Sequence, residues 1–573
     1  MRFKSEIFNL HEKIYESTAK RAQELFGESS KDLQSYFKEQ KKISAREFEI
    51  ATHADIFNKI ENSDIIFIAD FHTFDRNVYN LEKIILHLNE KQLNFTLALE
   101  MVSHNNQKYI DSFLDNHITE LEFLELINYN RSWRFPWAHY RKVFELAKTY
   151  NFKIIALNSR GSLNDRDNFA AKRICCSLER YSEESSSQVS SSLHKIIVFF
   201  GELHILPNKL PLCTQNYIKN THLEKINITI IHQNIDQVYL KLKSKNIENT
   251  IVRFNENEFS IQTSPPWIKY DSVIYWFENF TDDPDFNIHE YIIEKGFKIF
   301  GGSTIQNFQL ILDEILHSLK LDFFEKDKLS DFDLYDHTNL EYVQTITQTI
   351  KHTQLKTFFE YLLSQGLAFK VYDHKKYYSV YYSVNRFAHL AGVHLFTLLI
   401  EKINSESSKI SDNCSSAIPS LEGRLIEKNR SKRFLVFLQM TMISYFCTKI
   451  INPHRKCDMY IDIVNNLKLP NSKLSRRQKK YHIMAISILD NNIDINLLFK
   501  DHSLQAYYEV TKIIGKFFSE LLFEKMCNID YEFSVQFIKT IFFTKIIDYD
   551  IFIYIKDLLL GDNEYKKTHK REF

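Results

Sequence analysis

The sequence is poor in the residues that interrupt regular structure, with only 11 glycines and 9 prolines among 573 residues. Such a chain is expected to be mostly helix and strand with few special turns. Seven cysteines in a chain of this length exclude a small disulfide-stapled scaffold and favour a reducing compartment. Lysine plus arginine and aspartate plus glutamate both count 73, so the net charge gives no support to a nucleic-acid partner.

The chain also lacks a long hydrophobic run. Its most apolar stretch, FLVFLQMTMISYFC at 434–447, contains Gln439, Thr441 and Ser444 and is short for a membrane span, so it predicts a core helix. The first twenty residues hold no apolar run of signal-peptide length and no early cysteine for a lipid anchor. We therefore expect no membrane span and a cytoplasmic location.

A chain of 573 residues is too long for one ordinary core, and its character changes near residue 285. Before that point, apolar strand patterns alternate with helical patterns, which predicts a mostly parallel α/β sheet flanked by helices. After it, aromatic and aliphatic residues recur at helical spacing. We expect a helical extension at 1–45, an α/β domain at 46–285, and a large all-helical C-terminal region at 290–573 with a serine-rich break at 405–420. Strands are expected at 65–69, 95–101, 152–158, 195–200, 226–231 and 250–254.

Two of the expected strands end in the same pattern of a small residue, an acid, any residue and histidine. The pattern follows the strand in DIIFIADFHTF (64–74) and again in KIIVFFGELHILP (195–207), and a third strand, FTLALEM, ends in a glutamate. Ligands of open parallel sheets bind beyond the carboxyl ends of the strands. Five side chains are expected to meet there: Asp70, His72, Glu100, Glu202 and His204.

Imidazole and carboxylate groups together suit a divalent metal such as Fe, Mn, Zn or Co, which makes all five side chains candidate metal ligands. The same groups suit proton transfer to and from a bound water without a metal, with His72, Glu100, Glu202 and His204 as candidate catalytic residues. Acids and histidines at strand ends also cap helices or stay solvated. Two copies of the pattern in register favour a site over that structural explanation.

The order of these motifs resembles the ChaN family, the haem-binding-uptake branch of a superfamily that includes the Tiki proteases and the erythromycin esterases. That superfamily has two G-x-x-H motifs after strands and a glutamate at an intervening strand end. Here the motifs are Ala69–His72 and Gly201–His204, and the glutamate is Glu100. The stretches WRFPWAHYRKVFELAKTYNFKIIALN and DRDNFAAKRI are similar to the family as well, and the resemblance covers about residues 40–280.

The resemblance implies one of several functions. ChaN-like proteins bind iron or haem, with homodimers enclosing the haem as one arrangement, and this implies a small-molecule or haem ligand. Tiki-like proteins are metal-dependent peptidases, and erythromycin-esterase-like proteins use histidine and glutamate to activate water. Ala69 replaces the first glycine and Asp70 the usual glutamate, so a decayed binding scaffold is a third alternative. Whether the chain is an enzyme stays open.

Further residues near the expected strand ends are candidates for holding a ligand. Either Arg160 or Arg166 could clamp a carboxylate or a propionate, and Asp167 could orient a histidine of the site. Tyr140, Tyr129 and Tyr109 are available axial ligands for haem, and Trp133 and Trp137 could form a wall for an aromatic ligand. Each has a plainer alternative: a solvated arginine, a buried tyrosine, or a tryptophan that packs a loop onto the sheet.

Overall fold

The chain is described here by a computed structural model. It covers residues 2–26, 31–185, 194–221, 226–245, 247, 250–279, 304–372, 375–380, 383–410, 420–453, 455, 457–471, 474–490, 493–528, 531–561 and 566. The chain divides into two compact units, residues 19–276 and residues 1–18 together with 277–573. The boundaries expected from composition stay predictions. Most of the expected break at 405–420 lies outside the described residues.

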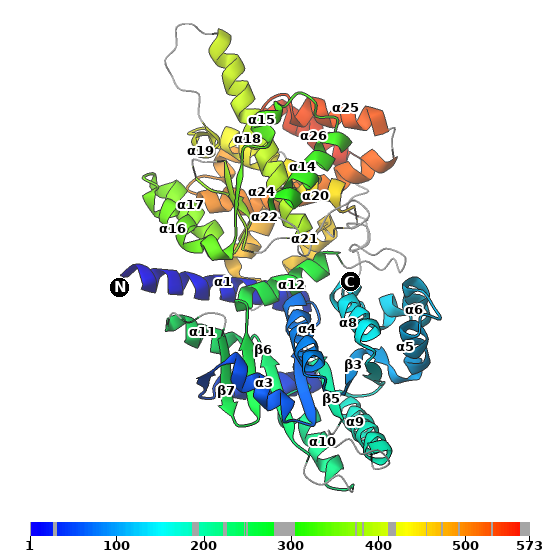
Figure 1. The fold of residues 1–573 in the computed structure, drawn as a ribbon. Coiled ribbons are helices and arrows are strands. Elements are labelled where there is room, and N and C mark those ends of the chain that lie inside the picture. The colour runs from blue at the N-terminus through cyan, green and yellow to red at the C-terminus, as the bar shows by residue number, and fades with distance from the viewer. Residues whose placement is uncertain are drawn as a thin grey trace. The chain divides into compact units, whose positions relative to one another are not determined.

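The first unit is built on a sheet in which eight strands are described (Figure 1). Its order is β1-β7-β8-β6-β2-β5-β3-β4, and neighbours are parallel except at β1/β7 and β7/β8. The predicted mostly parallel α/β sheet is therefore confirmed. The strands are β1 (Glu49–Ala51), β2 (Ile65–Asp70), β3 (Phe95–Ser103), β4 (Lys153–Asn158), β5 (Lys195–Gly201), β6 (Ile228–Gln233), β7 (Thr250–Asn255) and β8 (Glu258–Gln262).

Helices cover both faces of this sheet, because successive side chains of a strand point to opposite faces. Ile66 and Ile68 of β2 pack into a core with two of the helices, α4 and α8. Phe67 and Ala69 of the same strand pack into a second core with α9 and α10. The helical elements of the unit are α2 (Lys31–Ser44), α3 (His53–Glu61), α4 (Asp75–Glu90), η1 (His104–Asn106), α5 (Gln107–Leu114), α6 (Glu120–Leu126), α7 (Tyr129–Ser132), α8 (Trp137–Tyr150), α9 (Leu163–Ser185), α10 (Leu210–Ile218), α11 (Asp236–Ser244) and most of α12 (Pro266–Asn279).

Two strands of the sheet, β1 and β8, are absent from the sequence-based expectation. Strand β8 buries polar side chains, among them Glu258, Ser260 and Gln262, so the apolar criterion fails there. Arg46 donates to both carboxylate oxygens of Glu258 at 2.7 Å, and His232 lies 3.0 Å away. These contacts supply hydrogen-bond donors to the buried Glu258 carboxylate, whereas the local sequence would predict an exposed residue there.

The second unit is largely helical, as expected, but it also contains a small sheet, which corrects the all-helical expectation. Strand β11 pairs with β10 in antiparallel and with β9 in parallel fashion. The elements are α14 (Thr304–Ser318), α15 (Lys326–Leu329), β9 (Asp333–Tyr335), η2 (His337–Asn339), α16 (Leu340–Thr349), α17 (Thr353–Ser364), β10 (Phe369–Lys370), β11 (Lys376–Tyr378), α18 (Val384–Ile410), α19 (Leu421–Leu425), α20 (Arg430–Ile451), α21 (Tyr460–Asn466), α22 (Arg476–Asp490), α23 (Ile495–Leu498), α24 (Leu504–Asn528), α25 (Tyr531–Phe542) and α26 (Tyr549–Leu560), and α1 (Arg2–Phe26) begins in this unit.

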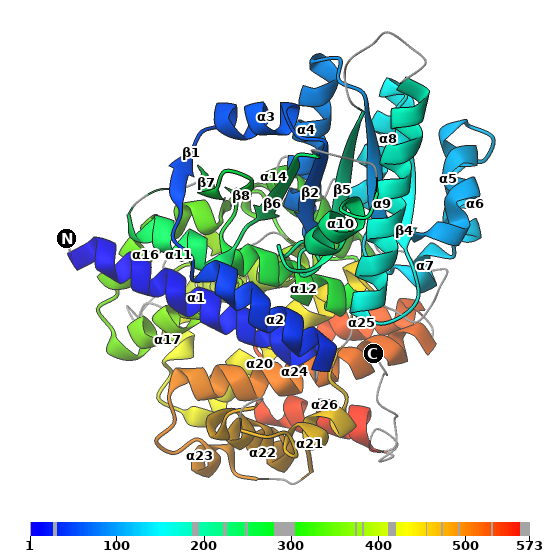
Figure 2. The same cartoon turned by 90° about the horizontal axis from the view of Figure 1, so that it is seen from below.

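Helix α20 contains the most apolar stretch of the sequence and is a core helix, as predicted. It packs against α18 and α24, and it lies beside α24 in Figure 2. Among the described residues it is the single helix whose length and composition would suit a membrane span, yet 89% of its most apolar window is buried inside the protein. Gly392 of α18 allows the close approach, because a Cβ atom there would lie 2.6 Å from Cα of Ser444 in α20.

Candidate functional site

The register of the sheet brings the two acid-x-His motifs together at one edge, as the sequence predicts. Strands β2 and β5 are neighbours, and Asp70 lies opposite Gly201. The backbone N–H of Glu202 donates to the carbonyl of Asp70 at 2.8 Å, which joins the two motifs directly after the strands. Strand β3 lies on the other side of β5 and carries Glu100 near the same edge, three residues before the strand ends at Ser103.

The first motif forms a histidine–carboxylate pair. The His72 Nδ1 atom lies 2.8 Å from Oδ2 of Asp70, and the hydroxyl of Tyr140 donates to the same oxygen at 2.7 Å. The rings of Trp133 and Phe135 pack against the imidazole at centroid distances of 4.5 and 4.8 Å. The His72 side chain is 22% exposed, whereas Asp70 is buried. This pair therefore presents one accessible imidazole, whose orientation is fixed by a buried acid.

Glu100 is the centre of the site. Its Oε2 atom accepts a hydrogen bond from the backbone N–H of Gly201 at 2.7 Å, and its Oε1 atom forms an ion pair with Arg166 of α9. The same Oε2 lies 3.7 Å from Nε2 of His72. Glu100 is 4% exposed, so its charge depends on these neighbours rather than on water.

Glycine at position 201 leaves room for this close approach of Glu100 and His72. A Cβ atom there would lie 3.1 Å from Oε2 of Glu100 and 3.2 Å from Nε2 of His72. Ala69, the matching residue of the first motif, is buried in the core on the α9 and α10 face. Replacing glycine by alanine at 69 therefore leaves the site intact, and Asp70, although shorter than glutamate, reaches His72.

The electrostatics of the site favour the charged forms of His72 and Glu100. Burial disfavours the imidazolium, but the Asp70 and Glu100 carboxylates outweigh burial and raise the pKa of His72 above its usual 6.5. Burial would likewise raise the pKa of Glu100, yet the two imidazoles, the Arg166 guanidinium and the Gly201 N–H together lower it below the usual 4.5. Burial, then the Asp70 charge, raises the pKa of Tyr140, which stays a hydrogen-bond donor.

The second motif forms another histidine–carboxylate pair, but its acid comes from outside the motif. His204 Nδ1 lies 2.5 Å from Oδ1 of Asp167 in α9, and the hydroxyl of Tyr36 in α2 donates to Oδ2 at 2.6 Å. Asp167 thus contacts a histidine of the candidate site, and its orienting role stays a prediction. The side chains of His204 and Asp167 are 7% and 1% exposed, so this pair is sealed from solvent.

Glu202 contacts neither histidine in a described hydrogen bond. Its Oε2 atom pairs with Lys269 of α12 at 2.8 Å, and its Oε1 atom accepts from the amide of Gln40 in α2 at 2.8 Å. The predicted set therefore separates: His72, Asp70 and Glu100 are in contact, while His204 and Glu202 have partners of their own.

The candidate ligand-holding residues lie in different environments. Arg160 is exposed, and Arg166 rather than Arg160 reaches the central carboxylate. Tyr140 and Trp133 are buried at 1% and 8% exposure and support His72 from within the unit. Sequence reasoning gave no role to Tyr36, Gln40 or Lys269, because no local pattern marks a side chain that reaches the site from a remote helix.

Metal ligation finds little support in this arrangement. Among the described residues there is no group of three or more histidine, cysteine, aspartate or glutamate side chains placed to hold a metal ion. The Glu100 and Glu202 oxygens already bind cationic or amide donors, and the Nδ1 atoms of both histidines bind carboxylates. Two fixed cations, Arg166 and Lys269, also oppose the entry of another positive ion.

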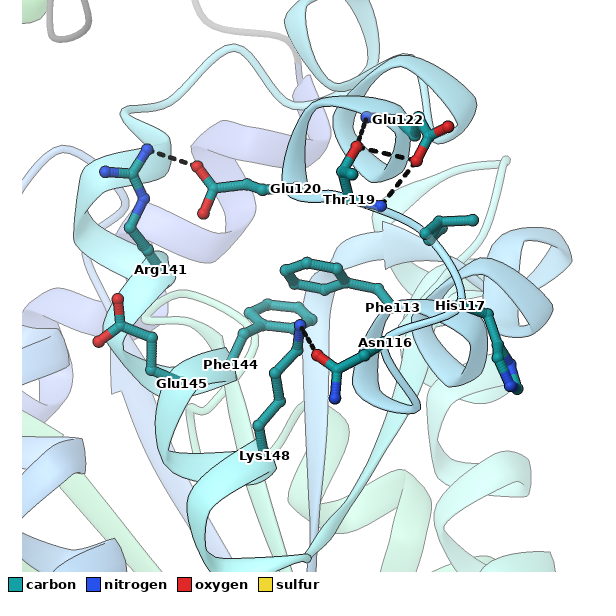
Figure 3. A pocket seen from close by; sticks show the side chains of 11 residues that line it. Phe113, Asn116, His117, Thr119, Glu120, Glu122, Arg141, Phe144, Glu145 and Lys148 are labelled. Atoms are coloured by element: carbon teal, nitrogen blue, oxygen red, sulfur yellow. Dashed lines mark hydrogen bonds and ion pairs between the residues drawn. The ribbon is translucent and has the colours of Figure 1, made fainter.

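A cavity of about 410 Å³ lies elsewhere in the unit, between α5, α6 and α8 (Figure 3). Phe113 and Phe144 line its apolar part, while Lys148, Arg141 and Glu120 carry charge around it. The Lys148 ammonium lies over the Phe113 ring at 3.7 Å, and Arg141 pairs with Glu120 at 2.5 Å. None of the side chains at the strand ends lines this cavity, so it is separate from the site.

Comparison with known proteins confirms the resemblance over part of the chain. Residues 56–166 match the family model described as haem-binding uptake, Tiki superfamily, ChaN. This match includes His72, Glu100 and Arg166 and ends before Asp167 and the second motif. A solved structure, described as cofacial heme binding to ChaN of Campylobacter jejuni, is 15% identical and covers 32% of this chain and 86% of its own. Its TM-score of 0.23 supports no conclusion about the site. No curated protein matches the sequence.

Haem does not fit the strand-end residues in their described positions. The Nε2 atom of His72 faces Gly201 and Glu100, so iron bound there would bring the macrocycle against the backbone of β5. Tyr140 is buried and donates its hydroxyl proton to Asp70, which leaves no access for a porphyrin. We therefore assign no haem ligand at this edge of the sheet.

The raised pKa of His72 predicts a pH-dependent contribution to stability. A group whose pKa is raised on folding stabilises the protein fully below its unfolded value, near 6.5, and loses this contribution as the pH rises through the folded value. We expect the loss in unfolding free energy on His72→Gln to be larger at pH 5.5 than at pH 9. Urea unfolding of both proteins at several pH values measures this difference. A difference that is constant with pH would contradict the assigned ion pairs.

Proposed function

We propose that the α/β unit carries a metal-free acid–base site that hydrolyses a carboxylic ester or amide, with His72 as general base. The observation that carries the proposal is the position of the His72 imidazole between two acids. Asp70 holds Nδ1 at 2.8 Å, and Nε2 lies 3.7 Å from Oε2 of Glu100. One water molecule can contact both Nε2 and Oε2 at ordinary hydrogen-bond lengths.

In the proposed reaction, neutral His72 carries its proton on Nδ1, where Asp70 accepts it. Nε2 takes a proton from the water while the water oxygen adds to the substrate carbonyl carbon. The imidazolium formed is stabilised by Asp70 and then returns the proton to the leaving oxygen or nitrogen. Glu100 orients the water, and its own charge is held in place by Arg166 and the Gly201 N–H.

Two further features support an intact site over a decayed scaffold. The departures from the family motif, Ala69 and Asp70, leave the His72 pair in place, as described above. The His72 side chain also remains 22% exposed, whereas Asp70 and Glu100 are buried. The expected homodimer, the cytoplasmic location and the lack of a nucleic-acid partner stay predictions.

Replacing His72 tests the proposal. We expect His72→Ala to lower kcat/KM for p-nitrophenyl acetate and butyrate by at least about 100-fold, the usual effect of losing a positioned base. His87→Ala is the matched control, because His87 also pairs with a carboxylate, Glu61, at 2.7 Å and is 19% exposed. Equal rates in the two variants would contradict the proposal, since any surface imidazole would then account for the hydrolysis.

Two conditions separate this mechanism from its alternatives. The rate should rise with pH through the raised pKa of His72, because only the neutral imidazole accepts a proton. Treatment with EDTA should leave the rate unchanged. A rate that EDTA abolishes and that added zinc, manganese or iron restores would instead establish the metal-dependent hydrolase.

Haem binding is the second candidate, and the family match at residues 56–166 favours it. Because the strand-end residues do not accommodate the macrocycle, haem would bind elsewhere on the chain. We expect any Soret band that appears on titration with haemin to persist in His72→Ala. A band that is present in the wild type and lost in His72→Ala, but not in His87→Ala, would place haem on His72 and overturn the acid–base mechanism.

A further inference from the structure

Helix α2 contributes two side chains to the acids of the second motif. Tyr36 donates its hydroxyl proton to Asp167, and Gln40, four residues later on the same helix face, donates to Glu202. Helix α2 lies outside the residues that match the family model. The second half of the site is therefore completed by a segment that the family match does not include.

Asp167 depends on Tyr36 because both of its oxygens are buried. The residue has no exposed surface, and a carboxylate in such a place needs a donor at each oxygen. His204 supplies one donor through Nδ1–H at 2.5 Å and Tyr36 supplies the other at 2.6 Å. These two contacts fix the carboxylate plane, which in turn fixes the plane and the tautomer of the imidazole.

Tyr36 is itself held firmly in place. Its ring meets the His204 ring edge-on at a centroid distance of 5.4 Å, and the Lys209 ammonium lies 3.9 Å from the Tyr36 ring centroid. The residue is 3% exposed. Burial and the Asp167 charge raise the pKa of the phenol, so it remains a proton donor throughout the physiological range.

We propose that Tyr36 is a positioning residue of the strand-end site, acting through Asp167 to hold His204 in one orientation with Nδ1 protonated. This rests on the proposed function for its catalytic consequence, but the Tyr36–Asp167–His204 chain is testable without a substrate. Gln40 and Lys269 hold Glu202 from opposite sides in the same way.

The test is proton NMR of the full-length protein in the far-downfield region, where protons in short histidine–carboxylate hydrogen bonds resonate. The wild type should show the His204 Nδ1–H resonance, and Asp167→Asn should abolish it. In Tyr36→Phe the resonance should move further downfield, because Asp167 then has His204 as its one remaining donor. Tyr361→Phe is the matched control, since Tyr361 donates to Glu509 at 2.7 Å in the other unit.

Two results would overturn the proposal: an unchanged His204 resonance in folded Tyr36→Phe, or the absence of any resonance that Asp167→Asn removes. If Tyr36→Phe fails to fold, as judged by circular dichroism, Tyr36→His retains a donor and should restore the wild-type resonance.

The effect of Tyr36→Phe on hydrolysis is measured in a separate experiment. We expect Tyr36→Phe to lower kcat for p-nitrophenyl acetate about tenfold, the effect of one buried hydrogen bond to a charged group, with little change in KM. If the NMR shift appears as predicted but neither the wild type nor any variant hydrolyses the ester, the proposed function is wrong. The role of Tyr36 in positioning His204 would still be supported.

Discussion

The buried charge of Glu100 is the constraint around which the site is built. A carboxylate in β3 that is 4% exposed must be neutralised by its neighbours, and the chain supplies a cation from α9, a backbone N–H from β5 and an imidazole from the loop after β2. Each of these contacts imposes a local requirement. Helix α9 must start so that Arg166 faces the sheet, and a side chain at residue 201 would crowd Glu100 and His72.

The two histidine–carboxylate pairs around Glu100 are alike in chemistry but unlike in exposure. His72 is held by an acid of its own motif and stays partly open to solvent. His204 is held by Asp167, which lies on a different element, and is covered by Tyr36. His72 is therefore the more exposed histidine of the two, while the buried His204 contributes to the field that acts on Glu100. A duplicated motif has thus produced two imidazoles with different environments, which is a condition for dividing acid and base roles between them.

The sequence contained enough information to predict the edge of the sheet where the site lies, but not the identity of all its members. Apolar parallel strands that end in Asp70-x-His72 and Glu202-x-His204 place those residues at the same edge of a sheet, but this pattern does not predict which of the side chains are in contact. The choice between Arg160 and Arg166 depends on the start of α9. Ser162 and Asp165 exchange capping hydrogen bonds there, which places Arg166 in the first turn and leaves Arg160 in the exposed loop before it. Tyr36 and Lys269 reach the site by tertiary packing, so no local sequence pattern marks them. Strand β8 was missed because several of its buried residues are polar.

A double-mutant cycle between Glu100 and Arg166 tests the central claim most directly. The free energies of unfolding of the wild type, Glu100→Gln, Arg166→Gln and the double variant would be measured in urea at pH 7. If the buried carboxylate depends on this cation, each single variant is destabilised, and the double variant is destabilised by at least about 1 kcal/mol less than the sum of the two. Additivity within about 0.5 kcal/mol would mean that the two side chains act independently, and Glu100 would then not be the residue that organises the site.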